Sequence, residues 1–389
     1  MLYALYKCID VREIQKGKSM KRKKSTQLLA VALTAAMLAQ PVGAQMVFAE
    51  GNADAVQQEQ AVSPAAETTG AVLKSGTAVI PADADLNQVK EILGKTLFVL
   101  LTGGEPLLYP HFRELYQKLR ELGMIITINT NGTLIDEAWA DFFAENKPRR
   151  INITLYGASN ETYERLCHYP GGFDKAVNGI RLLRERNIDV KVNGSLAKAN
   201  VDDRMKIIEL GESLDAPVRI DTYMYPSVRE RNHAYNNQAR LDPEMAAKAR
   251  VEVLQKEMGE EVFAQYRKIQ LDEAENTPEG EAVPGQMACR AGKSSFVVNW
   301  QGEMRSCVVL DKPSIPLRDV EFEEAWELTK KGTESLRISA RCSSCKLRKV
   351  CNTCVAAAIA ETGKADGVPE YLCRYTEATV RYLKETSKK

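Results

Sequence analysis

The chain has 389 residues, which is long enough for two or three domains with a sizeable hydrophobic core. Lys and Arg number 53 against 52 for Asp and Glu, so the charge balance gives no support to nucleic acid or an acidic surface as a partner. Seven of the nine cysteines fall between Cys289 and Cys373. Such crowding is typical of a metal or cluster module in a reducing compartment, or of a disulfide knot in an oxidising one.

Residues 1–49 are predicted to form a leader, and residues 50–85 a disordered linker. A basic run at 21–24 precedes an apolar run at 28–38 and then small residues, which is typical of a secretory signal peptide that starts at Met20. At about eleven residues the apolar run is too short to span a bilayer, so we predict no membrane span. The alternative is an ordinary amphipathic or buried helix. The linker is rich in Ala, Gln, Glu, Thr and Gly and nearly lacks aromatic residues.

Residues 86–225 alternate between strand and helix patterns with short connections. Strands are expected at 96–102, 125–129, 150–155, 190–195 and 218–223. Helices are expected at 110–122, 136–145, 160–166, 172–186 and 202–214. This alternation predicts an α/β fold with a parallel sheet, either open or part of a barrel. In a barrel the active site would lie at the carboxyl ends of the strands, where Gly103, Asn129 and Ser195 fall.

Residues 226–285 are charged and mostly helical in pattern, and we interpret them as a connector. Asp242 is expected to cap a helix whose first residue is Pro243. The remaining residues, 286–389, form the cysteine module.

The spacing of the seven crowded cysteines suggests two metal or cluster centres. These cysteines are Cys289, Cys307, Cys342, Cys345, Cys351, Cys354 and Cys373. Two residues between paired cysteines let a turn aim both sulfurs at one point. Seven thiolates exceed the needs of one four-ligand site and leave a second site one ligand short. The alternatives are a zinc module, which does not account for Cys373 or the Gly302-x4-Cys307 element, and disulfides, for which seven is an awkward number.

The stretch LTGGEPLLYP at 101–110 predicts a ligand-binding turn after the first strand. Gly103 and Gly104 remove side chains where a ligand would approach the backbone, and Glu105 offers a carboxylate to a cationic amine. The alternative is a simple tight turn that Pro106 helps to form.

These two features together resemble the radical S-adenosylmethionine (AdoMet) superfamily with a C-terminal SPASM domain. The likeness rests on the cysteine spacing and on LTGGEPLLYPHFRELYQKLRELGMIITINTNGTLID and INITLYGASNETYERL, and it runs from about residue 95 to the end. It implies a partial (βα)6 TIM-like barrel that lacks its first βα unit, followed by two auxiliary 4Fe-4S clusters. Cys342, Cys345, Cys351 and Cys373 would hold one cluster. Cys289, Cys307 and Cys354 would hold three corners of the other, although Cys351 and Cys354 stand one residue closer than the family pattern.

The resemblance also assigns roles in the barrel and implies partners. Gly103, Gly104, Glu105 and Pro106 would hold the amino group of AdoMet. Polar residues at later strand ends are candidates for ribose or carboxylate contacts, and each could equally be a turn or cap residue: Asn129, Asn131, Thr154, Asn193 and Ser195. The implied partners are a peptide or protein substrate and an electron donor such as flavodoxin or ferredoxin. The family implies a cytoplasmic location, which conflicts with the leader.

The CxxxCxxC motif that holds the radical-generating cluster in this family is not found. Upstream of Gly103 the only cysteine is Cys8, and neither it nor Cys167 has cluster spacing. The histidines His111, His168 and His233 show no metal spacing either. We therefore expect a peptide or protein maturase by descent, which the missing motif disables. A gene fusion that replaced the first βα unit would explain both the leader and this loss. The alternatives are a non-catalytic Fe-S protein for electron transfer or peptide binding, and a zinc-binding module.

Overall fold

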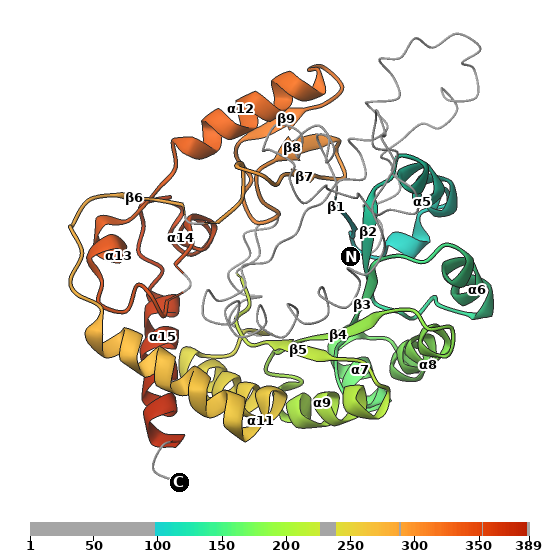
Figure 1. Ribbon diagram of the computed structural model, residues 1–389, viewed down its shortest axis with the longest axis horizontal. Helices are drawn as coiled ribbons and strands as arrows, with labels where there is room; N and C mark the ends of the chain where they lie inside the picture. Colours follow the sequence, from blue (N-terminus) through green and yellow to red (C-terminus); the bar gives the residue numbers. More distant parts are fainter. Residues whose placement is uncertain (1–97, 226–238, 288, 352, 387–389) are drawn as a thin grey trace, which may run out of the picture.

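The computed structural model describes residues 98–225, 239–287, 289–351 and 353–386 (Figure 1). The expected leader and linker lie outside the described residues, as do Cys8 and His233. Within the described ranges, no helix combines the length and apolar character that crossing a bilayer requires.

Five parallel strands form one sheet in the chain order β1-β2-β3-β4-β5. They are β1 Phe98–Leu101, β2 Ile125–Thr130, β3 Arg150–Leu155, β4 Val190–Ser195 and β5 Val218–Asp221. The sheet is curved, and its helices lie on the convex side (Figure 1). This arrangement confirms the expected α/β fold and has the form of a partial TIM-like barrel.

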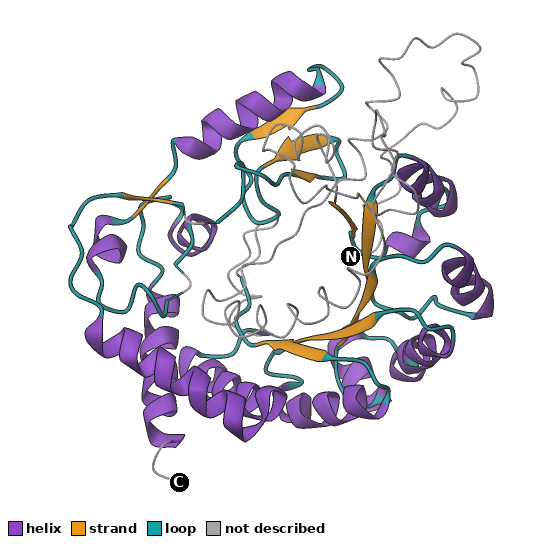
Figure 2. Cartoon of the chain, viewed as in Figure 1, coloured by secondary structure: helices purple, strands orange, loops and turns teal. Residues whose placement is uncertain are grey.

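One barrel helix follows each of β1, β2 and β4, whereas two helices follow β3 (Figure 2). They are α5 Phe112–Glu121, α6 Glu137–Glu145, α7 Asn160–Cys167, α8 Gly172–Glu185 and α9 Arg204–Ser213. Side-chain caps set two of the starts, because Asp136 accepts from the N–H of Trp139 at 2.9 Å and Ser159 from that of Thr162 at 3.2 Å. The helices expected from residues 110 and 202 begin later. A turn precedes α5, and the short 3-10 helix η2 Val201–Asp203 precedes α9.

The two faces of the sheet differ in character. On the convex face Ile126, Ile128, Ile151 and Ile153 are at most 3% exposed, because they pack beneath the helices. The alternate positions on the concave face are half-buried and mostly polar, and include Thr127, Asn129, Asn152, Thr154 and Asn193. A polar interior suits a face that receives a ligand rather than one that packs as a core.

The connector contains one long helical element, α11 Pro243–Asn276, as expected. The side chain of Asp242 caps it by accepting from the N–H groups of Glu244 and Met245, both at 3.0 Å. At Gly259 the backbone leaves the helical region with φ of 72°, so the element is two helices joined at a kink. It packs against the C-terminal helix α15 Glu370–Glu385.

The cysteine module is built from short strands and helices. Its strands are β6 Gly285–Gln286, β7 Val297–Val298, β8 Glu303–Arg305, β9 Ser314–Pro316 and β10 Arg337–Ile338. Its helices besides α15 are α12 Phe322–Glu334, α13 Ala340–Ser344 and α14 Val355–Thr362. Val298, Met304 and Leu372 belong to the same hydrophobic cluster as the barrel residues, so module and barrel share one core.

Candidate functional site

The GGEP turn lies directly after β1 at the carboxyl edge of the sheet. Gly103 and Gly104 are exposed, and a Cβ atom added to Gly103 would meet no heavy atom within 4 Å. Glu105, by contrast, is only 8% exposed and caps the short helix η1 Pro106–Leu108. The main chain of the turn is therefore accessible at the two glycines, whereas the Glu105 side chain is buried in the protein.

The Glu105 carboxylate accepts hydrogen bonds from three donors of the chain itself. Its Oε1 accepts from the Thr130 hydroxyl at 2.7 Å and from the N–H of Leu107 at 3.1 Å. Its Oε2 accepts from the N–H of Asn131 at 2.7 Å. Burial raises the pKa of Glu105, whereas these three hydrogen bonds oppose the rise. The side chain thus ties the turn after β1 to the end of β2.

The turn after β2 is closed by Asn131 and Gly132. The side-chain Oδ1 of Asn131 accepts from the N–H and hydroxyl of Thr133 at 2.9 and 2.8 Å. Gly132 has φ of 74°, and a Cβ there would lie 2.9 Å from Ile153 Cγ2, so only glycine fits. The Asn131 side chain therefore has the turn-forming role that the sequence left open as an alternative.

Other predicted polar residues lie on the concave face. Asn152 donates to Asn129 Oδ1 at 2.7 Å across β3 and β2. Thr154 and Asn193 are register partners on β3 and β4, and both are half-buried. Ser195 is exposed at the end of β4. The structure thus brings these residues to the same face and edge as the GGEP turn.

Asn200, which no sequence pattern singles out, holds the strand-end loops in place. It is 1% exposed, and its Nδ2 donates to the carbonyls of Tyr156 and Ser195 at 2.9 and 3.0 Å. Its Oδ1 accepts from the N–H of Ala197 at 2.7 Å. One amide therefore joins the chain segments that leave β3 and β4.

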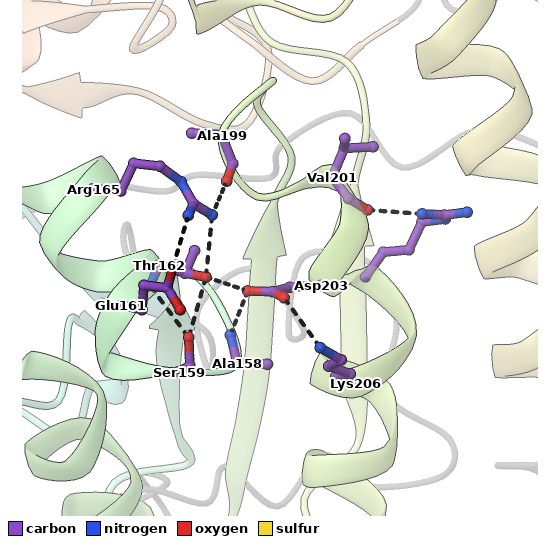
Figure 3. A network of polar contacts seen from close by, with 10 residues as sticks. Ala158, Ser159, Glu161, Thr162, Arg165, Ala199, Val201, Asp203 and Lys206 are labelled. Atoms are coloured by element: carbon purple, nitrogen blue, oxygen red, sulfur yellow. Dashed lines mark hydrogen bonds and ion pairs between the residues drawn. The ribbon is translucent and has the colours of Figure 1, made fainter.

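Asp203 makes a second connection between the same loops (Figure 3). Its carboxylate accepts from the N–H of Ala158 at 3.0 Å and from the Thr162 hydroxyl at 2.7 Å. Arg165 of α7 adds a bond to the Ala199 carbonyl at 2.8 Å. The rim of the barrel at β3 and β4 is therefore preorganised. In the sequence, the only signal was an Asp pair before a helix, which resembles an ordinary cap.

Four thiols of the cysteine module form one neighbourhood. Burial raises the pKa of Cys342, and the nearby thiols of Cys351 and Cys345 raise it further. Burial, with Cys351, Glu370 and Cys342 as further causes, raises the pKa of Cys373 to about 11. These are the four residues that the resemblance groups around one cluster.

The other three thiols form a second neighbourhood. Burial raises the pKa of Cys354, and the thiols of Cys307 and Cys289 add to the rise. The N–H groups of Ala357 and Ala356, at the start of α14, bond to the Cys354 sulfur and oppose it. Main-chain N–H groups aimed at a sulfur favour its thiolate form, which is the form that binds metals.

Cys307 is positioned by the predicted glycine element, which forms the β7–β8 hairpin. Gly302 has φ of 75° and donates to the Asn299 carbonyl at 3.0 Å, so it supplies the left-handed turn residue. After β8, the Cys307 sulfur accepts from the N–H of Val309 at 3.4 Å. The hairpin therefore presents this thiol to its neighbours.

The described cysteines are all free thiols. In the same part of the chain, no three His, Cys, Asp or Glu side chains gather closely enough to hold a single metal ion. Cys167 ends α7 apart from the cysteine module, and burial raises its pKa. His111 Nδ1 lies 3.3 Å from Glu114 Oε1, and His168 is the C-terminal cap residue of α7.

Comparisons with known proteins identify the family that the barrel domain resembles. Residues 75–211 match the model of the radical SAM superfamily. The AdoMet-dependent heme synthase of Methanosarcina barkeri is 25% identical over 284 residues, which cover 70% of this chain and 80% of that protein. The PqqA peptide cyclase of Ruegeria pomeroyi is 28% identical over 116 residues, 30% of this chain and 31% of that protein.

Two solved structures share the fold. The structure of anSMEcpe with bound AdoMet and Cp18Cys peptide has a TM-score of 0.55 at 20% identity, covering 77% of this chain and 89% of that one. Streptococcus suis SuiB bound to its precursor peptide SuiA has a TM-score of 0.52 at 17% identity, covering 72% and 65%. Together with the five-stranded sheet and the GGEP turn, the matched model shows that this chain contains a domain of the radical SAM superfamily.

Proposed function

We propose that this protein binds AdoMet at the carboxyl edge of its barrel and two 4Fe-4S clusters in its cysteine module, and that it acts on a peptide or protein. The observation that carries the proposal is the presence of seven free thiols in the cysteine module of a chain that also contains a radical SAM domain. The ligand sets, four thiols for one cluster and three for the other, are those that the family resemblance implies.

The open main chain of the GGEP turn supports the AdoMet site. The carbonyls of Gly103 and Gly104 are the acceptors that we assign to the ammonium group of AdoMet. Glu105 acts indirectly by fixing the turn, because its three hydrogen bonds go to protein donors. Thr154, Asn193 and Ser195 are our candidates for the ribose and carboxylate contacts, since they share the concave face and its carboxyl edge.

The chemistry of the thiol groups fits iron-sulfur clusters. Free thiols supply the thiolate ligands that such clusters use. The N–H groups at the start of α14 would stabilise the negative charge of a cluster bound to Cys354. When bound, the clusters would store and transfer electrons.

The proposed activity stops short of AdoMet cleavage. Radical formation in this family uses a cluster held by CxxxCxxC, and the chain contains no such motif. We therefore infer that this chain binds AdoMet and substrate without producing 5′-deoxyadenosine on its own. An electron donor such as flavodoxin or ferredoxin would exchange electrons with the clusters.

The substrate class is drawn from fold neighbours with bound peptides, anSMEcpe and SuiB. A second candidate is a haem precursor, because the relatives that cover most of this chain are named AdoMet-dependent heme synthases. Titration of iron-loaded protein with a peptide library and with iron coproporphyrin separates the two.

Anaerobic reconstitution with iron counting tests the proposal. We expect about eight irons per chain, about four in each of the variants Cys354→Ala and Cys373→Ala, and no change in the control Cys167→Ala. Bound zinc without iron would remove the cluster assignment. Release of 5′-deoxyadenosine by this chain would overturn the inference that it does not cleave AdoMet.

A further inference from the structure

A small pocket lies where the kinked helix α11 packs against α15 (Figure 1). Arg250 lines it from the first half of α11, and Tyr266 and Gln270 line it from the second half. A straight helix would separate Arg250 from Tyr266 by about 24 Å, so the kink at Gly259 brings these side chains together. The empty volume is about 380 Å³ with the solvent at its mouth included, which suits a small ion rather than a large cofactor.

The lining of this pocket carries polar groups but no acid. No Asp or Glu is among the residues that border it. The hydroxyls that α15 contributes already have partners: that of Tyr375 bonds to the hydroxyl of Thr222 at 2.8 Å, and those of Thr376 and Thr379 donate to main-chain carbonyls of α15 at 2.9 and 2.7 Å. Within the described ranges the side-chain amide of Gln270 has no hydrogen-bond partner, so its N–H₂ group is free for a ligand.

Arg250 supplies the positive charge of the pocket. Its guanidinium is always protonated and carries five donors in a flat fork that fits a carboxylate or a phosphate group. The side chain is only partly exposed, and it forms no ion pair with any residue that the structure describes. Two acids act on its charge from further away, and both have other partners: Asp221 pairs with Arg219 at 3.0 Å, and Glu257 accepts from the N–H of Ile220 at 3.0 Å. The pocket therefore holds a cation without a direct counter-charge.

We propose that this pocket binds a small oxyanion, through a carboxylate or phosphate group that pairs with Arg250 and accepts further hydrogen bonds from Gln270 and Tyr266. The bound ion holds the two halves of α11 to α15. Val350 also borders the pocket and stands next to Cys351 in the sequence, so the same ion stabilises the joint between the connector and the cysteine module. The site needs neither AdoMet nor a cluster, so it does not depend on the proposed function.

Calorimetric titration of the full chain with sodium phosphate and, separately, with sodium acetate tests the site. Sodium chloride keeps the ionic strength constant in both titrations. We expect saturable binding of one ion per chain, and an unfolding temperature that rises by about 2–4 °C as the site fills. Tighter binding of phosphate would assign the pocket to a phosphate group, and tighter binding of acetate would assign it to a carboxylate.

Substitutions in the pocket separate this site from binding elsewhere on the surface. Arg250→Met removes the charge partner and should weaken binding at least about tenfold. Gln270→Leu keeps the charge, should weaken binding about threefold, and gives a readout even where Arg250→Met does not fold. The matched control is Arg267→Met on the same helix, because Arg267 does not border the pocket and donates to the Thr386 carbonyl at 3.0 Å. It should bind the ion as the wild type does.

Two results would overturn the proposal. The first is the absence of saturable binding of either ion to the wild type, which would mean that water alone fills the pocket. The second is an affinity of Gln270→Leu and of Arg250→Met equal to that of Arg267→Met, which would mean that the ion binds at another place.

Discussion

Glu105 joins two loops at the carboxyl edge of the barrel, and each of its three partners is a hydrogen-bond donor. The change Glu105→Gln keeps the shape of the side chain but places an amide NH₂ group, itself a donor, next to hydrogen-bond donors. We expect a loss of about 1–3 kcal/mol in the free energy of unfolding and weaker AdoMet binding. Urea denaturation and calorimetric titration measure the two effects.

The control for that variant is Glu114→Gln on α5, whose side chain is 77% exposed. It should leave both quantities unchanged within error, because this mostly exposed side chain pairs with His111 at the surface and takes no part in the three hydrogen bonds of Glu105. If Glu105→Gln behaved like this control, the carboxylate would have no bracing role.

We expect Glu257 on α11 to make the free energy of unfolding depend on pH. Burial raises its pKa from 4.5 to about 7, while its bond to the N–H of Ile220 and the charges of Arg250, Arg219 and Lys191 oppose the rise. Because the folded pKa is raised, the stabilising contribution is present below about pH 4.5 and is lost as the pH rises through 7. The loss is at most about 3 kcal/mol.

Urea denaturation between pH 5 and pH 8 measures this contribution. Glu257→Gln removes the titrating group, so its free energy of unfolding should fall less over this range than that of the wild type. Glu260→Gln, an exposed position on the same helix, should follow the wild type. Parallel curves for wild type and Glu257→Gln would show that this carboxyl does not titrate as described.

The loops after β3 and β4 depend on Asn200. Asn200→Ala leaves the carbonyls of Tyr156 and Ser195 and the N–H of Ala197 without their side-chain partner. We expect a loss of about 2–3 kcal/mol and faster hydrogen exchange in these loops. Hydrogen exchange read by mass spectrometry checks this, with the exposed Asp202→Asn as control. Unchanged exchange in both loops would contradict the role of Asn200.

Local patterns were enough to predict most of the barrel elements. The strands at 150–155 and 190–195 match residue for residue, because alternating apolar residues and short connections specify them. The starts of α5 and α9 were wrong by two residues, since turn or 3-10 backbone precedes both helices. Helix boundaries of this kind depend on hydrogen bonds that propensity does not resolve.

The site was less predictable than the elements. The inward turn of Glu105 depends on Thr130 and Asn131, which follow 25 and 26 residues later and meet it only through strand register. The sequence therefore located the GGEP turn but not the direction of its acid. The two thiol sets came from a family resemblance, and their ligand roles stay predictions.

A buried ion pair joins the segment before α11 to the cysteine module. Arg240, just before α11, donates to Glu361 of α14 at 2.6 Å, with side chains only 8% and 15% exposed. Its guanidinium lies 3.4 Å from the ring centre of Tyr371 on α15. Tyr223, which follows β5, donates to the same Glu361 oxygen at 3.3 Å. Segments far apart in the chain therefore meet at one charge pair.

This pair and the shared core predict a single cooperative unfolding transition. Single-tryptophan variants that keep Trp139 of α6 or Trp326 of α12 should give the same urea midpoint, because Val298 and Met304 belong to the barrel core. Two separate midpoints would show that barrel and module unfold independently.

Arg240→Met tests the pair itself, because it leaves the Glu361 carboxylate buried without its cation. Breaking a buried pair costs about 3–5 kcal/mol, so both tryptophan midpoints should fall together. Arg240→Met/Glu361→Met should recover part of that loss, since no unpaired charge remains. The control Arg204→Met breaks a more exposed pair with Glu252, at 23% and 33%, and should cost about 1 kcal/mol or less. A fall at Trp326 alone would mean that Arg240 stabilises only the cysteine module and does not couple it to the barrel.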